Sequence, residues 1–198
     1  MTESTSFLGE PPESAAAAAV HAAYVEDDGY VANYARTWCW RPDLLTGFAD
    51  LRQQLMGESS LSPGELAVLV VATASAIGDS YCSLAWGGRL AGSRGEPAAA
   101  AALRGVDDGL SVREAALLVW ARRVVGDPNG IGEADVARLR EAGFDDREIF
   151  EATAWIGFRL AFSTINDALG IAPDRELAES VPAAVREAVS FGRPPSTI

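Results

Sequence analysis

The chain has 198 residues, of which 48% are hydrophobic and 22% charged, a composition typical of one folded domain with a sizeable core. Its 28 acidic and 16 basic side chains give a net charge of −12, so we expect no nucleic acid as a partner. Every basic residue is an arginine, which excludes lysine Schiff-base chemistry and a P-loop lysine. One histidine and two cysteines are too few for a multi-histidine or four-thiolate metal site, and there is no glycine-rich nucleotide fingerprint. We therefore expect neither a metal nor an organic cofactor.

No targeting or membrane signal is evident in the sequence. The first 14 residues lack the basic and apolar regions of a signal peptide. The most apolar stretch, residues 66–88, carries Asp79 near its centre, where a bilayer would impose a cost of about 2.5–3.5 kcal/mol. We expect a cytoplasmic protein that contacts no membrane and keeps its thiols reduced.

The first half of the chain is predicted to be helical after a disordered leader over residues 1–12. Helices are expected over 13–28, which is rich in alanine, and over 42–57, which has one apolar stripe. Ser62 and Glu65 form a capping box before a helix that is apolar on every side. Such a helix belongs in the centre of a core or at a subunit interface, and we therefore predict a homo-oligomer.

Asp79 is predicted to begin the next helix. Following Gly78, it can act as the N-cap and accept a hydrogen bond from the amide of Cys82. This helix ends before an expected loop at residues 92–95. Further helices are expected over 96–105, over 133–142 and over 145–169. A capping box formed by Ser111 and Glu114 predicts the start of another helix. A last helix over 176–191 is expected to be broken at Pro182. No segment alternates with a period of two, so the fold class is all-α: one helical domain over 13–192 and a loose tail over 193–198.

The order and spacing of several segments resemble the carboxymuconolactone decarboxylase and alkylhydroperoxidase D superfamily, most closely its peroxidase-related branch. These segments are EDDGYVANY, the helix beginning at Arg41-Pro42, LSPGELAVLVVA, SYCSLAW, LSVREAALLVWA and INDALGI. The resemblance covers about residues 27–171. It implies an AhpD-like helical domain that assembles as a dimer, trimer or hexamer. It also implies thiol peroxidase chemistry, from Cys-x-x-Cys with a histidine four residues later and an upstream glutamate.

The sequence departs from this active-site pattern at most of its positions. Asp79 and Cys82 occupy the two cysteine positions, Trp86 that of the histidine and Ala67 that of the glutamate. Glu65 lies nearby, but is better explained as a capping residue. The resemblance therefore implies the scaffold with a degenerate Cys-x-x-Cys motif and without the dithiol mechanism. The decarboxylase branch is expected to need a histidine that this region lacks.

Asp79, Cys82 and Tyr81 are the candidate catalytic residues. Asp79 has two compatible interpretations: a helix cap, or a pocket carboxylate whose pKa rises enough for acid–base work. Cys82 is either a small buried residue or a single redox thiol. The full negative charge of Asp79 outweighs the roughly half charge of the helix terminus, so we predict a sluggish thiol.

The candidate binding residues are less directly indicated. Trp86 lies on the same helix face as Cys82, and either shapes an apolar pocket or packs in the core. The family's architecture implies a group at the pocket entrance: Tyr30, Asn33, Tyr34 and Arg36. The most direct interpretations of the other notable residues are structural: His21 on a helix face, Cys39 buried, and Asn166 and Asp167 as polar core partners.

Three functional hypotheses remain open. The first is an enzyme that acts on a small organic molecule through Asp79, by proton transfer, decarboxylation or cyclisation. The second is a single-cysteine peroxidase or reductase that uses Cys82 with an external thiol. The third is a catalytically silent binding or assembly protein.

Overall fold

The computed structural model describes residues 5–197, which contain eleven α-helices, one 3-10 turn and no β-strand. The all-α prediction is confirmed. In chain order the elements are α1 (Ala15–Asp28), α2 (Asn33–Trp38), α3 (Pro42–Gly57), α4 (Pro63–Ile77), α5 (Ser80–Arg94), α6 (Glu96–Leu103), α7 (Val112–Gly126), η1 (Pro128–Gly130), α8 (Glu133–Glu141), α9 (Asp146–Ala168), α10 (Arg175–Ser180) and α11 (Ala183–Ala188). None of the helices in this part of the chain is long and apolar enough to cross a bilayer.

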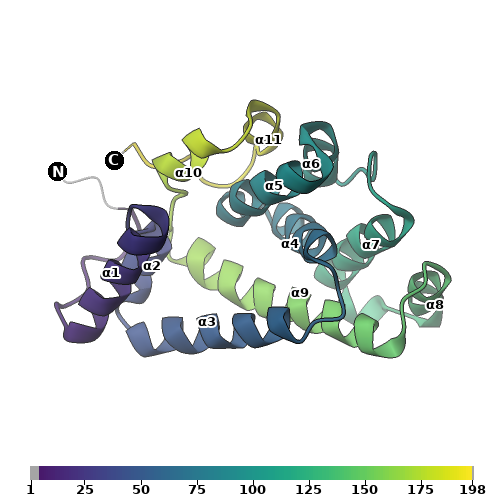
Figure 1. Cartoon of the computed structure of the whole chain (residues 1–198), viewed down its shortest axis with the longest axis horizontal. Coiled ribbons are helices and arrows are strands. Elements are labelled where there is room, and N and C mark those ends of the chain that lie inside the picture. Colours follow the sequence, from purple (N-terminus) through teal and green to yellow (C-terminus); the bar gives the residue numbers. More distant parts are fainter. Residues whose placement is uncertain (1–4, 198) are drawn as a thin grey trace.

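Helix α4 is the centre of the core. It packs against α5, α6, α7 and α9 (Figure 1), and its residues from Leu66 to Ala74 are all buried. A helix that is apolar on every side is therefore covered by helices of its own chain. The predicted core position is confirmed, but the inference of an oligomer from this helix loses its basis. A homo-oligomer stays a prediction.

Side chains near in sequence cap the starts of several helices. Ser62 and Glu65 cap α4, Ser111 and Glu114 cap α7, and Asp145 and Glu148 cap α9, each pair as a complete capping box. The side chain of Asp79 caps α5 and accepts from the amide nitrogen of Cys82 at 2.9 Å. The caps predicted at Ser62, Asp79 and Ser111 are thus confirmed.

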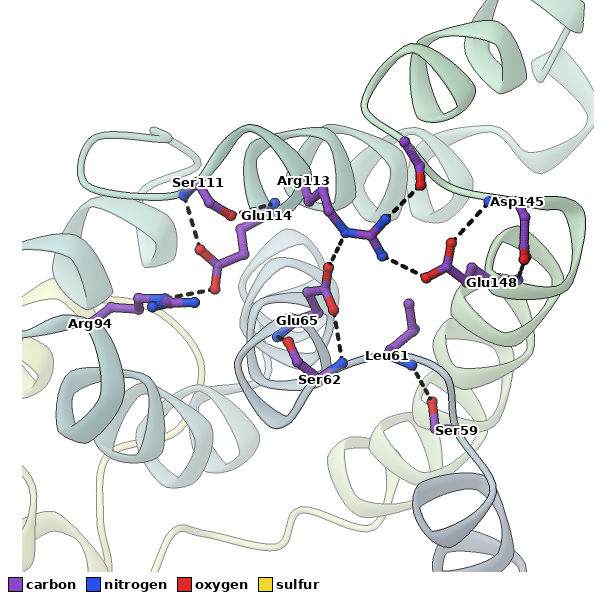
Figure 2. A network of polar contacts seen from close by, with 11 residues as sticks. Ser59, Leu61, Ser62, Glu65, Arg94, Ser111, Arg113, Glu114, Asp145 and Glu148 are labelled. Carbon is purple, nitrogen blue, oxygen red and sulfur yellow. Dashed lines mark hydrogen bonds and ion pairs between the residues drawn. The ribbon is translucent and has the colours of Figure 1, made fainter.

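Two arginines connect these capping glutamates between helices (Figure 2). Arg113 donates to Glu65 at 2.6 Å and to Glu148 at 2.7 Å, and Arg94 donates to Glu114 at 2.8 Å. Each glutamate therefore uses one carboxylate oxygen for its own cap and the other for an arginine. Burial raises the pKa of Glu65, but the hydrogen bonds from Arg113 and Ser62 outweigh it, and the pKa is lowered overall. The network joins the starts of α4, α7 and α9.

Replacement of Arg113 should therefore destabilise the fold. Arg113→Gln leaves Glu65, which is 7% exposed, without its cation, and we expect a loss of about 1–2 kcal/mol in the free energy of unfolding. Urea unfolding monitored by tryptophan fluorescence measures it. The matched control is Arg123→Gln, which breaks a longer and more exposed pair with Asp135 and should cost less than about 1 kcal/mol. Equal losses would contradict the role given to Arg113.

The chain ends and one loop differ from expectation. Within the expected disordered leader, the amide of Phe7 donates to the carbonyl of Leu169 at 2.8 Å, so this part pairs with the end of α9; residues 1–4 lie outside the described residues. The expected tail also packs, since the amide of Ser196 donates to the carbonyl of Pro173. The loop expected at 92–95 begins later, because α5 continues to Arg94. The predicted break at Pro182 is confirmed.

Candidate functional site

A cavity of about 100 Å³ lies where α1, α2, α3, α5 and α9 meet. In Figure 1, α3 and α9 run below α5, and α1 and α2 lie at one end of them. The residues that line it are Tyr24, Tyr34, Leu45, Phe48, Ala49, Arg52, Tyr81, Cys82, Ala85, Trp86, Arg89, Arg159 and Phe162. Another cavity, of about 230 Å³ between α7 and α8, is lined by none of the predicted site residues. The cavity that contains Cys82 is therefore the candidate site.

Cys82 lies in the first turn of α5, and its thiol is surrounded by polar groups. Nη1 of Arg159 donates to Sγ at 3.3 Å, and Oγ of Ser163 lies 3.8 Å from it. Burial, and after it the negative charge of Asp79, raises the pKa of the thiol to about 12, against the opposing effect of Arg159. The thiol is therefore protonated at neutral pH, although two hydrogen-bond donors face its sulfur.

Asp79 is completely buried behind Cys82. Its Oδ1 accepts the Cys82 amide, whereas Oδ2 has no hydrogen-bond partner within the described part of the chain. Asp79 is absent from the cavity wall. Its position therefore lets it act on the thiol through its charge, whereas its carboxylate does not line the cavity.

A second carboxylate, Asp167 near the end of α9, interacts with Asp79. Burial, followed by the like charge of Asp79, raises the pKa of Asp167 to about 6. The main opposing effect is the positive charge of Arg193. Ionised Asp167 therefore destabilises the folded state.

The stability of the chain should depend on pH through this group. The pKa of Asp167 in the folded chain is raised above its value of about 3.9 in the unfolded chain. The stabilisation of the folded state by protonated Asp167 is therefore fully present below about pH 4 and is lost as the pH rises through 6. We expect Asp167→Asn to be more stable than the wild type by about 1–2 kcal/mol at pH 7, with the difference gone near pH 4. Urea unfolding at several pH values measures this. A constant difference over that range would exclude Asp167 as its source.

Tyr81 joins the cavity wall to a buried carboxylate. Its hydroxyl donates to Oδ2 of Asp174, and Oδ1 of Asp174 accepts the amide of Asn33 at 2.7 Å. Burial raises the pKa of Tyr81 well above its usual value, and the charge of Asp174 adds to this effect. The Tyr81 ring lies edge-on to that of Tyr34, whose hydroxyl is 2.7 Å from that of Tyr24. Polar side chains thus line the α1–α2 end of the cavity.

The structure brings together only some of the residues predicted for the site. Cys82, Tyr81, Trp86 and Tyr34 line the cavity, whereas Asp79, Tyr30, Asn33 and Arg36 do not. The backbone amide of Asn33 instead donates to Asp174, and burial, followed by the charge of that carboxylate, raises the pKa of Tyr30. Arg36 is exposed and donates to the carbonyl of Val31. The group expected at the entrance is therefore divided between the cavity, the surroundings of Asp174 and the surface.

Several residues of the site were not found from the sequence. They are Asp174 and, on the cavity wall, Phe48, Arg52, Arg89, Arg159 and Phe162. Phe48 belongs to the apolar stripe of residues 42–57 and Phe162 lies in the helix predicted over 145–169, so their positions in the sequence indicate packing in the core and not a site. No spacing rule distinguishes Arg159 or Asp174 from other charged residues of the chain.

His21 and Cys39 lie away from the cavity wall. Sγ of Cys39 is 3.5 Å from Nε2 of His21, and burial raises the pKa of that thiol. Both cysteines are free and buried. Within the described residues, no group of three or more His, Cys, Asp and Glu side chains is arranged to hold a metal ion. Cys82 is thus the one thiol among the residues that line the cavity.

Solved structures with similar folds place the chain among known proteins. No protein-family model and no curated protein matches it. A peroxidase-related protein from Ralstonia eutropha JMP134, described as an alkylhydroperoxidase AhpD core, has 25% sequence identity and a TM-score of 0.76, over 97% of this chain and 98% of that one. A peroxidase-related protein from Silicibacter sp. TM1040 has 25% identity and a TM-score of 0.78, over 89% and 97% of the two chains.

A third match shares the fold at lower identity. It is the debrominase Bmp8, solved as a cysteine-to-alanine variant in complex with 2,3,4-tribromopyrrole, with 18% identity and a TM-score of 0.68, over 92% of this chain and 95% of that one. Since the two peroxidase-related proteins match this chain over nearly their whole lengths, the resemblance inferred from the sequence is confirmed. The chain belongs to the AhpD-like, peroxidase-related superfamily.

Proposed function

We propose that this chain is an enzyme that acts on a small organic molecule in the Cys82 cavity by acid–base chemistry and has lost dithiol peroxide reduction. The observation that carries the proposal is the state of the Cys82 thiol. It lines the cavity, but burial and the charge of Asp79 hold its pKa at about 12. Asp79 occupies the position of the other cysteine in the motif that the resemblance implies, so the motif is degenerate and a disulfide within it cannot form.

In the proposed reaction the protonated thiol acts as a general acid, and a pKa of about 12 restricts it to bound molecules that develop a strongly basic atom beside it. When Cys82 donates its proton to a bound molecule, the thiolate that remains accepts a hydrogen bond from Arg159 and faces the hydroxyl of Ser163. Water returns the proton once the product has left. Asp79 is then a positioning residue, which holds the resting thiol in its protonated form. This modifies the first of the three hypotheses, in which Asp79 itself acted on the substrate.

The pH dependence of Cys82 alkylation tests the proposal. In a Cys39→Ala background, the rate with iodoacetamide should keep rising above pH 9 without reaching a plateau, because the thiolate remains scarce. Hydroperoxide should be consumed no faster than by a Cys82→Ala control. A plateau near neutral pH, or rapid peroxide consumption that depends on Cys82 and is sustained by an added thiol, would overturn the proposal.

The second candidate function is a single-cysteine oxidoreductase. The observation that favours it is Nη1 of Arg159 at 3.3 Å from Sγ, since a nearby guanidinium stabilises a thiolate. In the same assay, this function would appear as peroxide consumption that depends on both Cys82 and an added thiol. The third hypothesis, a silent binding protein, predicts that a Cys82→Ser variant binds ligands unchanged and that no turnover is found.

A further inference from the structure

The cavity wall contains three arginines that have no acidic partner. They are Arg52 on α3, Arg89 on α5 and Arg159 on α9. No carboxylate lines the cavity, and none of the three forms an ion pair within the described residues. Acidic residues outnumber arginines by 28 to 16, and Arg94 and Arg113 each pair with glutamate. The charged side chains that line the cavity are therefore all positive, although the chain is acidic overall; negative charge acts on Cys82 from Asp79 behind it and on Arg89 from Asp28.

The most deeply placed of the three, Arg159, has unused hydrogen-bonding capacity. It is 6% exposed, Nη1 donates to the sulfur of Cys82, and Nε is buried without a partner in the described structure. A buried donor left unpaired is costly, and more so when it is charged. An acceptor bound in the cavity beside Cys82 would satisfy it.

The other two arginines, Arg52 on α3 and Arg89 on α5, line the cavity and are also partly exposed at the surface. The guanidinium carbon of Arg89 lies 4.5 Å from the centroid of the Trp86 ring. Partial burial of this group, followed by the positive charges of Arg52 and Arg159, lowers the pKa of Arg89. The three positive charges thus repel one another, and an anion between them would relieve this repulsion.

The rest of the wall is aromatic and apolar. Phe48 and Phe162 stack with ring centroids 5.1 Å apart, and Trp86 and Leu45 also line the cavity. The volume of about 100 Å³ is smaller than the roughly 150 Å³ of an apolar cavity that binds one benzene ring. The walls therefore suit one small ring, and a bound ring with a carboxylate must extend toward the exposed arginines.

We infer that the cavity binds a small organic anion, whose apolar ring packs between the aromatic side chains while its carboxylate accepts hydrogen bonds from Arg159 and is attracted by Arg52 and Arg89. Arginine presents planar paired donors that match a carboxylate. The inference deepens the proposed function, since it rests on the cavity as the binding site and gives the chemical class of the substrate. It also places the ligand's charged group beside the Cys82 proton.

Calorimetric titration with matched probes tests this inference. Benzoate has the ring and the charge, benzamide the ring without the charge, and acetate and inorganic phosphate the charge without the ring. We expect benzoate to bind at least about tenfold more tightly than each of the others, and to weaken as salt is added. Equal binding of benzamide would overturn the role of the arginines. Equal binding of acetate or phosphate would overturn the role of the ring, and no binding of benzoate would overturn the inference as a whole.

Variants assign the binding to this cavity. Arg159→Met should weaken benzoate binding about tenfold or more, whereas Arg104→Gln, which removes an exposed arginine at the end of α6, should leave it unchanged. If Arg159→Met fails to fold, the exposed pair Arg52→Gln and Arg89→Gln takes its place. Unchanged affinity in the cavity variants would contradict the inference.

The outcome can be separated from that of the proposed function. Benzoate that binds and slows Cys82 alkylation supports the inference even if Cys82 proves to be a peroxide-reducing thiolate. Conversely, if the thiol stays protonated while benzoate and benzamide bind alike, the proposed function stands and the inference that the cavity binds an anion is refuted.

Discussion

In the Asp79→Asn variant, Cys82 is expected to be alkylated about tenfold faster than in the wild type at pH 8. The reason is that a fall of about one unit in the pKa of the thiol increases the small thiolate fraction about tenfold. The charge of Asp79 is, after burial, the largest cause of the raised pKa of Cys82. Asparagine removes this charge and is an equally good N-cap, so α5 should begin as before. Iodoacetamide labelling in a Cys39→Ala background, followed by mass spectrometry, measures the rate.

An opposite change provides the control. Arg159→Met removes the guanidinium that favours the thiolate, and should slow labelling at the same pH. Far-ultraviolet circular dichroism and the urea midpoint show whether either variant has altered the fold. If Asp79→Asn labels at the wild-type rate, the charge of Asp79 does not hold the Cys82 thiol in its protonated form, and the role given to this residue in the proposed function is wrong.

The sequence was most informative where the determining interactions are local. The Ser62–Glu65 and Ser111–Glu114 capping boxes and the Asp79 cap each join residues three apart, so spacing alone locates them. The apolar character of α4 likewise determines its place in the core. The sequence could not determine what covers α4, because helices of the same chain and helices of a second subunit present equally apolar surfaces.

The site depends on pairs that are distant in sequence. Arg159 reaches Cys82 across 77 positions, and Asp174 reaches Tyr81 across 93. Local spacing does not indicate such pairs, since many charged residues of α9 and the segment after it are equally plausible partners. The resemblance led to Cys82, Tyr81 and Trp86 because Tyr81 and Cys82 match the family's motif and Trp86 occupies the position of its histidine. It did not reveal the arginines, which lie on three different helices.

The entrance group shows the same limit at shorter range. Helix α2 has only six residues, too few for hydrophobic periodicity to define its inward face. Tyr34 faces the cavity and Arg36 the solvent, whereas the backbone of Asn33 is held by Asp174. A carboxylate from beyond the end of α9 therefore determines how this segment lies.

Asp174→Ala is expected to lower the free energy of unfolding by about 2–4 kcal/mol, because it leaves two buried donors, the Tyr81 hydroxyl and the Asn33 amide, without their acceptor. Asp174 is 3% exposed and joins the segment before α10 to both α2 and α5. Burial raises the pKa of Asp174, so keeping this carboxylate ionised in the folded state costs free energy. Replacement by alanine recovers part of that cost. The expected loss of stability is therefore smaller than the sum of two hydrogen bonds to a charged group. Urea unfolding at pH 7, monitored by tryptophan fluorescence, measures the change.

Two further variants separate the lost acceptor from the lost charge. Asp174→Asn keeps one carbonyl oxygen in place and should recover about half of the stability that alanine loses. Glu179→Ala removes an exposed carboxylate from the neighbouring α10 and should change stability by less than about 0.5 kcal/mol. If Asp174→Ala were as stable as Glu179→Ala, the buried hydrogen bonds of Tyr81 and Asn33 would not hold the C-terminal segment against the wall of the cavity. In that case the α1–α2 end of the site must be positioned by aromatic packing alone, through Tyr34 against Phe162 and Tyr81.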